Sequence, residues 1–575
     1  MPRHTTTSER IDELPWLIYW LKRMQVDVII DRVLGPPHGN WKGLSYGELA
    51  LLFVAYVVMN CTHFLSPMQE WARKHCTSLS QAFGKPVCEQ DFTDDRLAVL
   101  LSHLGDETTR PGEHIELELG RRLLRAYDLP TQTAHIDMTS VSVYHQPKDD
   151  EGLVRFGHSK DRRPDLRQFK LVLGTLDPVG LPLVTAPLSG EQADDPHYIP
   201  TWERLVEVIG RTDFLAVGDC KLASLANRAH IQSRGGFYLT PLPLTGNTPD
   251  ELRAWVIKPP APLQEIRLPG QEESESPVGL GFGVEVLCDW QTPDTQGRVT
   301  WRERRLVLQS QAYAKRQQTG LRERLEKAEI ALSALNTRPA TKPTDLEPRA
   351  QAILKRFSVT DYLCLSFNEQ VTCQTGYVGP GRPGPKRTMH IIQTRTWTVK
   401  PKQRQAAINL FNRLAGWRVF VTNVPAGRLS LADAVNCYRK EWQPEHGFHR
   451  LKGGWLAITP LFLQDDNRIR GLLVLLGIAL RVLTLTEFVA RRSLAKSGET
   501  LKGLYDGNPN RATEKPTTER LLKAFKDMTL YRHETATETW YEITELSPLQ
   551  RRILQLLGIP DSVYAPPDTL LMGSG

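Results

Sequence analysis

The sequence contains few cysteines, and none of them is arranged as a metal or disulfide motif. Eight cysteines are spread over 575 residues, and no two of them form a Cys-x-x-Cys pair. A zinc ribbon and a disulfide framework are therefore not indicated, and reduced thiols are expected. Residues 1–16 also lack the basic-then-apolar pattern of a signal peptide. These absences predict a cytoplasmic location.

Long apolar runs are missing as well. The two most apolar stretches, residues 49–59 and 472–480, are much shorter than the roughly 20 residues that a membrane-spanning helix needs. Arg481 ends the second stretch. Because 40% of the residues are hydrophobic, a chain of this length has ample material for a core. We therefore predict that both stretches are buried helices of a soluble globular protein.

Charge of one sign is only in modest excess. The formal net charge is +7 at neutral pH, with 72 Lys and Arg against 65 Asp and Glu. Such a balance permits a polyanionic partner but does not demand one. The function must therefore be read from motifs rather than from the total charge.

The most informative motif lies in residues 431–452, where a helical apolar pattern carries polar residues at a regular spacing. Tyr438, Glu445 and Lys452 are each seven residues apart. Seven residues are close to two helical turns, so one continuous helix would present a phenol, a carboxylate and an ammonium on one face. The alternative interpretation is an amphipathic surface helix with solvated charges.

Two residues interrupt this motif. Pro444 removes a backbone donor, which costs about 3 kcal/mol inside a helix unless the helix kinks or restarts. We expect a kink, with Pro444 near the first turn of a second helical segment. Glu441 precedes Glu445 by four residues, so their carboxylates share a face and repel each other unless a cation lies near them.

An alternation of strands and helices begins at residue 133, after a helical region at residues 11–125. The pattern predicts three strands at 133–145, 168–176 and 181–189, a helix at 200–209, a strand at 214–217, a helix at 222–233 and a strand at 236–240. Asp137 falls on the first strand, and Asp219 follows the fourth. An aspartate at the end of a strand caps a helix more often than it binds a metal ion, so the significance of these two rests on their combination with Glu445.

An inserted domain must separate Asp219 from Glu445, because the interval is too long for one connection. We expect strands at 283–288 and 298–308, a leucine seam between Leu321 and Leu335 that packs against the insertion, a loop or linker at 337–348 and strands within 357–399. A buried strand at 418–423 then leads into the motif. Beyond it we expect a long core helix within 459–492, a helix at 518–528 and an edge strand at 541–546.

A loop at residues 379–387 interrupts the last pair of strands of the insertion. Its Gly-Arg-Pro core is followed by Lys386 and Arg387, and Arg382 lies in the core itself. A narrow, AT-rich minor groove attracts arginine side chains of this kind. The alternative interpretation is a flexible basic hairpin loop.

The motif resembles the tyrosine, arginine, glutamate, lysine signature of insertion-sequence DDE transposases of the IS-four group, and most closely its sixteen-thirty-four branch. The matching residues are Tyr438, Glu445, Phe448, Leu451 and Lys452. Glu441 stands where that signature has its arginine. The order of strands and helices also resembles the catalytic domain of these enzymes. The resemblance implies an α/β RNase H-like catalytic domain with a β-rich insertion, plus an all-helical N-terminal domain.

The expected domain boundaries follow from this resemblance. They are a helical N-terminal domain at 1–128, the first part of the catalytic domain at 129–240, an insertion with strands and a helical hairpin at 241–416, the second catalytic part with the signature helix at 417–500, and a helical tail at 501–575. The N-terminal domain would bind element ends, contribute to dimerisation or act as a structural cap.

The resemblance implies metal-dependent cleavage of DNA at insertion-sequence ends and strand transfer into target DNA. Asp137, Asp219 and Glu445 would be catalytic and would hold two Mg²⁺ ions, for which Mn²⁺ can substitute, with Asp137 as the bridging ligand. The residues expected to contact DNA are Tyr438, Arg439, Lys440, Lys452, Arg382, Lys386 and Arg387. The expected partners are double-stranded DNA, as terminal inverted repeats and target, and a second copy of the chain in a synaptic homodimer. The location would be the nucleoid.

Two other functions are compatible with the same residues. One is a nuclease, or a cleavage-dead or domesticated DNA-binding protein, with an RNase H fold. The other is a metal-free structural protein whose acidic residues are surface charges. Because Glu441 stands in the arginine position of the signature, a cleavage-dead DNA-binding protein remains an alternative.

Overall fold

The computed structural model describes residues 4–146, 151–272, 274–291, 297–338, 340–382, 384–567 and 570–571. The chain divides into two units. The first comprises Met1–Thr240, Asp289–Trp301 and Cys437–Gly575, and the second comprises Pro241–Cys288 and Arg302–Asn436.

A mixed β-sheet lies at the centre of the first unit. Its strands are β2 (Thr133–Val143), β3 (Arg167–Leu176), β4 (Leu181–Ser189), β5 (Leu215–Gly218) and β6 (Phe237–Pro241), in the order β4-β3-β2-β5-β6. β3 is antiparallel to β2 and β4, whereas β5 is parallel to β2 and β6. The predicted strands are confirmed, and the sheet is that of an α/β nuclease-like fold.

Helices cover both faces of this sheet. A Cβ added at Gly174 of β3 would lie 3.1 Å from Leu205 of α8 (Tyr198–Ile209), and one added at Gly447 of α15 (Trp442–Lys452) would lie 3.1 Å from Leu173. Leu173 and Gly174 are consecutive strand residues, so they point to opposite faces. α8 and α15 therefore lie on opposite sides of β3. The predicted helices at 200–209 and 222–233 are confirmed as α8 and α9 (Leu225–Ser233).

The N-terminal region is helical, as predicted for residues 11–125. Its α-helices are α1 (Leu14–Met24), α2 (Val26–Leu34), α3 (Tyr46–Asn60), α4 (Ser66–Arg73), α5 (Cys76–Phe83), α6 (Asp94–Leu104) and α7 (Pro111–Ala126). They belong to the same unit as the sheet. Their role as a separate DNA-binding or dimerisation domain stays a prediction.

The two apolar stretches form buried helices, as predicted. α16 (Asp466–Ser497) packs against α3, α6 and β4. By length and composition α16 would be able to cross a membrane, but 89% of its most apolar window is buried inside the structure. Almost every residue of α3 is buried as well, and a capping box of Ser45 and Glu48 begins that helix. Both helices are core elements.

The C-terminal region contains more β-structure than expected. It has the helices α17 (Thr518–Lys523) and α18 (Pro548–Leu557), but also the strands β13 (Thr529–Glu534) and β14 (Glu538–Ile543). The sheet order is β1-β13-β14-β15, where β1 is Thr5–Arg10 and β15 is Leu570–Leu571. The predicted edge strand at 541–546 is wrong in position, because β14 has partners on both sides. The predicted helix at 518–528 ends at Lys523.

The second unit contains a long hairpin and all or most of four further paired strands. The sheet order is β12-β9-β8-β7, formed by β12 (Trp417–Thr422), β9 (Arg298–Ser310), β8 (Gly279–Gln291) and β7 (Gln264–Ile266), with α10 (Thr248–Ile257) and α13 (Gln405–Leu414) nearby in sequence. The hairpin consists of β10 (Leu363–Tyr377) and β11 (Met389–Gln403). These strands confirm the β-rich character of the insertion and the strand predicted at 418–423.

Two helices pack on the hairpin. α11 (Gln311–Leu335) places Leu321, Leu325, Ala328 and Leu332 in a buried cluster, which confirms that the leucine seam packs against the insertion. The loop expected at 337–348 is partly wrong, since α12 (Pro343–Arg356) begins within it; Pro339 lies outside the described residues. Leu346 of α12 is fully buried in the same cluster, and this tertiary packing outweighs the cost of Pro348 inside the helix.

Candidate active site

Two aspartates come together where β5 ends beside β2 in the first unit's sheet. Asp137 lies in β2, and Asp219 directly follows β5. The parallel register pairs Ile136 with Gly218, so the next residue on each chain segment is an aspartate. Neighbouring strands are about 4.8 Å apart, which places the two aspartates next to each other.

Hydrogen bonds fix one oxygen of each aspartate. Asp137 Oδ1 accepts from the backbone N–H of Met138 at 2.7 Å. Asp219 Oδ1 accepts from the hydroxyl of Tyr198 at 2.6 Å and from the N–H of Lys221 at 2.8 Å. Burial raises the pKa of Tyr198 well above its ordinary value, which keeps the hydroxyl protonated as a donor. In the described part of the chain, neither Oδ2 accepts a hydrogen bond from the protein.

The signature motif is not one continuous helix. α14 (Leu431–Arg439) ends before Lys440, and α15 begins at Trp442, with Pro444 in its first turn. The predicted kink is confirmed. The premise that Tyr438, Glu445 and Lys452 share a face of one helix is wrong, because the break places Tyr438 on α14 and the other two on α15.

The turn after β3 holds this break in place. Lys440 Nζ donates to Asp177 Oδ2 at 2.9 Å, and Gln443 Nε2 donates to Asp177 Oδ1 at 2.9 Å. Asp177 is buried. Lys440, expected to contact DNA, therefore forms an ion pair with a buried carboxylate of the protein itself.

The carboxylate of Asp137 faces the side of the sheet that α15 covers. Asp137 pairs with Leu173 across β2 and β3, and Leu173 contacts α15 near Gly447. Residues directly opposite on neighbouring strands project to the same face. The helix that carries Glu445 and the strand that carries Asp137 are thus packed against each other.

The pKa values of two acids reveal a cluster of four carboxylates. Burial raises the pKa of Asp137 from its ordinary 3.8 to about 6, and the charges of Asp219 and Glu445 add to this effect. Burial likewise raises the pKa of Glu441 from 4.5 to about 7, and the charges of Asp137, Asp219 and Glu445 act in the same direction. A hydrogen bond with Tyr438 opposes the shift at Glu441. The four acids therefore lie within electrostatic reach of one another.

Lys160, in the segment between β2 and β3, places a positive charge near the cluster. Lys160 Nζ donates to the carbonyl of Met138 at 2.5 Å and lies 3.3 Å from Asp194 Oδ2. Its charge lowers the pKa of Asp137 and partly opposes burial. Neither Lys160 nor Tyr198 belongs to a sequence motif, so the sequence alone does not indicate them. Only the packing of the loop and of α8 brings them to the aspartates.

The remaining candidate residues either pair with another group of the protein or are exposed to solvent. Lys452 Nζ lies 3.3 Å from both carboxylate oxygens of Asp161 and is partly exposed. Arg439 ends α14. Arg382 and Lys386 are exposed in the turn between β10 and β11, and Arg387 donates to the carbonyl of Gly381 at 2.6 Å. These three belong to the second unit.

The carboxylate cluster has the donor chemistry of a site for a divalent cation. Carboxylate oxygens are the ligands that Mg²⁺ and Mn²⁺ prefer. Among the described residues, no group of three or more His, Cys, Asp or Glu side chains is already arranged around a metal position. Burial, and to a smaller extent the charges of the neighbouring acids, raises the pKa of Asp137 and of Glu441, and a divalent cation would favour the charged forms of both. The acids therefore fit such an ion.

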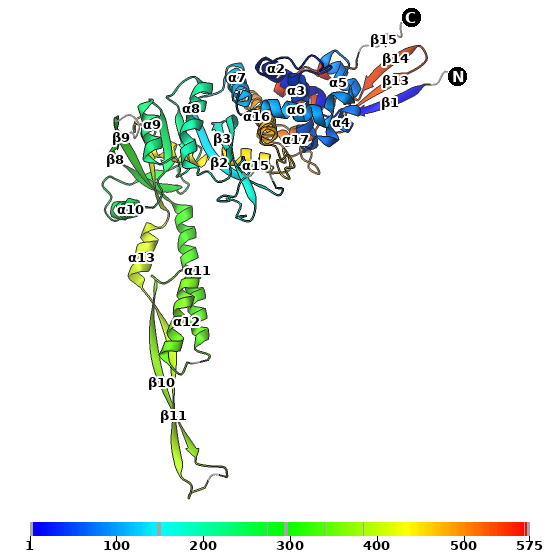
Figure 1. Cartoon of the computed structure of the whole chain (residues 1–575). Coiled ribbons are helices and arrows are strands. Elements are labelled where there is room, and N and C mark those ends of the chain that lie inside the picture. Colours follow the sequence, from blue (N-terminus) through cyan, green and yellow to red (C-terminus); the bar gives the residue numbers. More distant parts are fainter. Residues whose placement is uncertain are drawn as a thin grey trace. The chain divides into compact units, whose positions relative to one another are not determined.

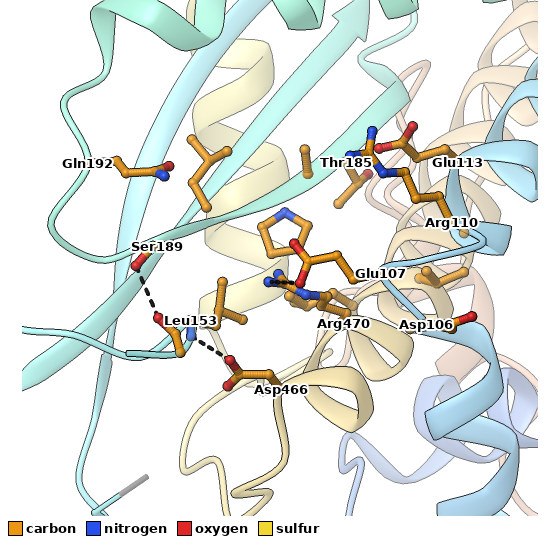
Figure 2. A pocket seen from close by; sticks show the side chains of 18 of the residues that line it. Asp106, Glu107, Arg110, Glu113, Leu153, Thr185, Ser189, Gln192, Asp466 and Arg470 are labelled. Carbon is orange, nitrogen blue, oxygen red and sulfur yellow. Dashed lines mark hydrogen bonds and ion pairs between the residues drawn. The ribbon is translucent and has the colours of Figure 1, made fainter. Parts of the chain in front are cut away.

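A cavity elsewhere in the first unit does not contain these acids. It has a volume of about 630 Å³ and is lined by residues of α7, β4 and α16 and of the segment 151–155. Arg470 pairs with Glu107 at 3.1 Å, and the N–H of Leu153 donates to Asp466 at 2.5 Å. Both interactions are drawn in Figure 2. The charged groups that line this cavity pair with one another and so connect the elements around it. The carboxylate cluster is the candidate active site.

Comparisons with known proteins identify the family of the chain. A family model described as a transposase DDE domain matches residues 129–482, a range that contains Asp137, Asp219 and Glu445. No curated protein matches. Among solved structures, the chain is similar to a cryo-EM structure of a piggyBac transposase synaptic complex with hairpin DNA. That match has 9% sequence identity and a TM-score of 0.31, and it covers 89% of this chain and 80% of the other.

Proposed function

The chain belongs to the transposase DDE domain family, and on that premise we propose that it cleaves DNA at insertion-sequence ends and joins the freed ends to target DNA. The observation that carries this proposal is the cluster formed by Asp137, Asp219 and Glu445 on the sheet and on α15. The β4-β3-β2-β5-β6 order supports an RNase H-like catalytic domain. The matching residues of the signature motif support assignment to the IS-four group and its sixteen-thirty-four branch.

We propose that Asp137, Asp219 and Glu445 hold two Mg²⁺ ions, for which Mn²⁺ can substitute. When bound, such ions activate a water molecule and stabilise the leaving 3′ oxygen. Tyr198 orients Asp219 by donating to its Oδ1. Lys160 places a positive charge beside Asp137, where a scissile phosphate would approach.

The proposed partners are the terminal inverted repeats of the element, the target DNA and a second copy of the chain in a synaptic homodimer. Tyr438, Arg439 and Lys452 lie on α14 and α15 and would contact phosphates near the cut. Lys440 is the weakest member of this set because of its ion pair with Asp177. Arg382, Lys386 and Arg387 would contact the DNA further from the cut. The protein would act at the nucleoid.

The first experiment replaces each proposed ligand. Asp137→Asn, Asp219→Asn and Glu445→Gln should each abolish cleavage of duplexes that carry the element's terminal repeats, because each change removes an anionic metal ligand. Binding of the same duplexes should persist. Asp213→Asn is the control, because Asp213 is exposed and pairs with Arg211 outside the cluster. Full cleavage by any of the three variants would refute the assignment.

The choice between the two glutamates has its own comparison. Glu445→Gln should abolish cleavage, whereas Glu441→Gln should retain part of it. Glu441 bonds with Tyr438 and is more deeply buried, while Glu445 is exposed and accessible to an ion and a phosphate. The reverse result would transfer the third ligand position to Glu441.

A second candidate function is a cleavage-dead DNA-binding protein of the same fold. Two observations favour it: Glu441 occupies the arginine position of the signature, and Lys440 is paired within the protein. The wild-type chain would then bind terminal-repeat duplexes but cleave none of them in either Mg²⁺ or Mn²⁺. Cleavage in either ion excludes this candidate.

A further inference from the structure

The hairpin of β10 and β11 is a two-stranded antiparallel ribbon. Its strands pair without interruption from Leu363 and Gln403 to Tyr377 and Met389, fifteen residues on each strand. At about 3.4 Å per residue, the ribbon is roughly 50 Å long. Figure 1 shows α11 and α12 beside its near part, while its far part extends beyond both helices.

The two faces of this ribbon differ in chemistry. Leu363 and Val399 are buried against α11 and α12, with Leu365, Phe367 and Trp397 packed around them. Strand side chains alternate, so these odd-numbered residues define one face, which we name the covered face. The even-numbered residues form the opposite face, which we name the polar face.

The polar face consists mainly of hydrogen-bonding and basic side chains. Its polar members include Ser366, Asn368, Gln370, Thr372, Gln374, Thr394, Thr396, Thr398, Lys400 and Lys402. It contains no acidic residue. Residues 363–403 carry six Lys and Arg but one acid, Glu369, which lies on the covered face and pairs with Arg395 at 3.5 Å. The polar face is therefore uniformly neutral or positive.

This face has no protein layer over it in the described part of the unit. Gln370, Thr372 and Gln374 are exposed, as are Thr394 and Lys400 on the other strand. An isolated two-stranded ribbon is marginally stable in water, so a ribbon of this length is expected to gain stability from a partner. The absence of acids and the excess of bases indicate a polyanion.

We propose that the polar face of the ribbon lies in the major groove of DNA. This inference rests on the proposed function and names the part of the DNA that the insertion reads. The major groove is about 12 Å wide and admits a two-stranded β-ribbon. Asn and Gln side chains can form paired hydrogen bonds with adenine, and Thr can bond to base edges or contact the thymine methyl group. Lys400 and Lys402 would contact phosphates beside the groove.

A protein partner is the competing occupant of the ribbon, and it would use the other face. On the far part of the covered face, Val371, Met389 and Ile391 are exposed by 51%, 60% and 68%. These apolar side chains suit a protein surface rather than DNA. DNA on the polar face and protein on the covered face make opposite predictions for substitutions on the two faces.

A pair of matched substitutions tests this assignment. Gln374 lies on the polar face opposite Ile392, and Gln393 lies on the covered face opposite Cys373. Both are exposed and neighbours along the ribbon, so Gln374→Glu and Gln393→Glu add the same charge at nearly the same place. Full-length protein would first select duplexes from a pool of 40-base-pair DNA with a randomised centre. Dissociation constants for the selected duplexes would then be measured.

Gln374→Glu should weaken binding by about tenfold or more, the cost of losing one specific base contact. Gln393→Glu should weaken it by less than about threefold, the effect of one added charge at the periphery. Equal losses of affinity in the two variants would overturn the proposal, because the added charge would then weaken binding regardless of the face on which it lies. A loss confined to Gln393→Glu would also overturn it, in favour of docking through the covered face.

Chemical footprinting identifies the groove. Dimethyl sulfate modifies guanine N7 in the major groove and adenine N3 in the minor groove. The wild-type protein should protect guanine N7, and Gln374→Glu should lose this protection. Protection of adenine N3 alone would place only the Arg382 turn in the minor groove and would overturn the proposal. If the wild-type protein neither binds nor cleaves DNA, the proposed function is refuted. If it does both, but Gln374→Glu and Gln393→Glu weaken binding equally, only the ribbon assignment is refuted.

Discussion

At the scale of single residues, the carboxylates of the candidate site are held in an environment that disfavours their charge. Asp137 and Glu441 have pKa values of about 6 and about 7, raised mainly by burial and further by neighbouring acids. One unit of pKa corresponds to about 1.4 kcal/mol, so ionising both groups near neutral pH costs on the order of a few kcal/mol. A divalent cation would offset this cost.

The binding of Mg²⁺ should therefore depend on pH. Since metal ligands must be deprotonated, the stabilisation of the protein by Mg²⁺ should be large at pH 8 and should fall as the pH decreases through 7 and 6. Thermal unfolding at increasing Mg²⁺ concentrations and at these three pH values measures the effect. A Mg²⁺-dependent shift that is the same at pH 8 and pH 6 would contradict the assignment.

The metal-free protein gives the complementary measurement. The folded-state pKa values of both acids lie above their ordinary values, so between about pH 4 and 7 the folded state binds more protons than the unfolded state. The contribution of these acids to stability therefore decreases as pH rises through that window. In a chelator, Asp137→Asn should raise the free energy of unfolding more at pH 8 than at pH 4.

At the scale of secondary structure elements, α15 is fixed by a buried cation. The guanidinium of Arg450 is only 2% exposed and donates to Glu487 of α16 at 2.5 Å and to Glu519 of α17 at 2.8 Å. Both partners are largely buried as well. This network joins the helix that carries Glu445 to two later helices.

Arg450→Leu should lower the free energy of unfolding by about 3 kcal/mol, because it leaves the buried carboxylate of Glu519 without its cation. Glu487 would keep its second ion pair, with Arg491 at 2.7 Å. Urea unfolding measures the change. Arg73→Leu is the matched control, because its ion pair with Glu70 is exposed to solvent and contributes little to stability. Equal effects of the two substitutions would show that the Arg450 network does not stabilise the fold.

At the scale of the whole molecule, the two ends of the chain are joined by a strand pair. β1 pairs with β13 over six residue pairs, from Thr5 with Glu534 to Arg10 with Thr529. Glu9 also accepts from the N–H of Thr77 at 2.8 Å and from the hydroxyl of Ser78 at 2.7 Å, at the start of α5. The N-terminal strand thus connects the helical region to the C-terminal hairpin.

Removal of residues 1–10 should therefore lower the melting temperature and expose the hairpin at residues 529–543 to proteolysis, because β13 loses a neighbour and becomes an edge strand. Mass spectrometry of limited-digestion fragments identifies the cleavage sites. A variant lacking only residues 1–3 keeps β1 and should behave like the full chain. Unchanged digestion of the longer deletion would show that β1 does not protect the hairpin.

The sequence by itself determined the local features of this protein. Alternation of apolar and polar residues predicted β2 to β6, and the break at Pro444 followed from the geometry of one residue. The positions of Asp137 and Asp219 on their elements were also available, because strand order and periodicity are properties of a short window. These features are decided by residues a few positions apart.

Only the tertiary structure decided what depends on distant residues. Arg450 and Glu519 are 69 positions apart, and Lys440 and Asp177 are 263 apart, so no local pattern relates them. The helix at Pro348 and the strand pair of β1 with β13 likewise exist because buried contacts and strand pairing outweigh local preference. The packing of α11 and α12 likewise decides which face of the β10–β11 ribbon is left open to solvent.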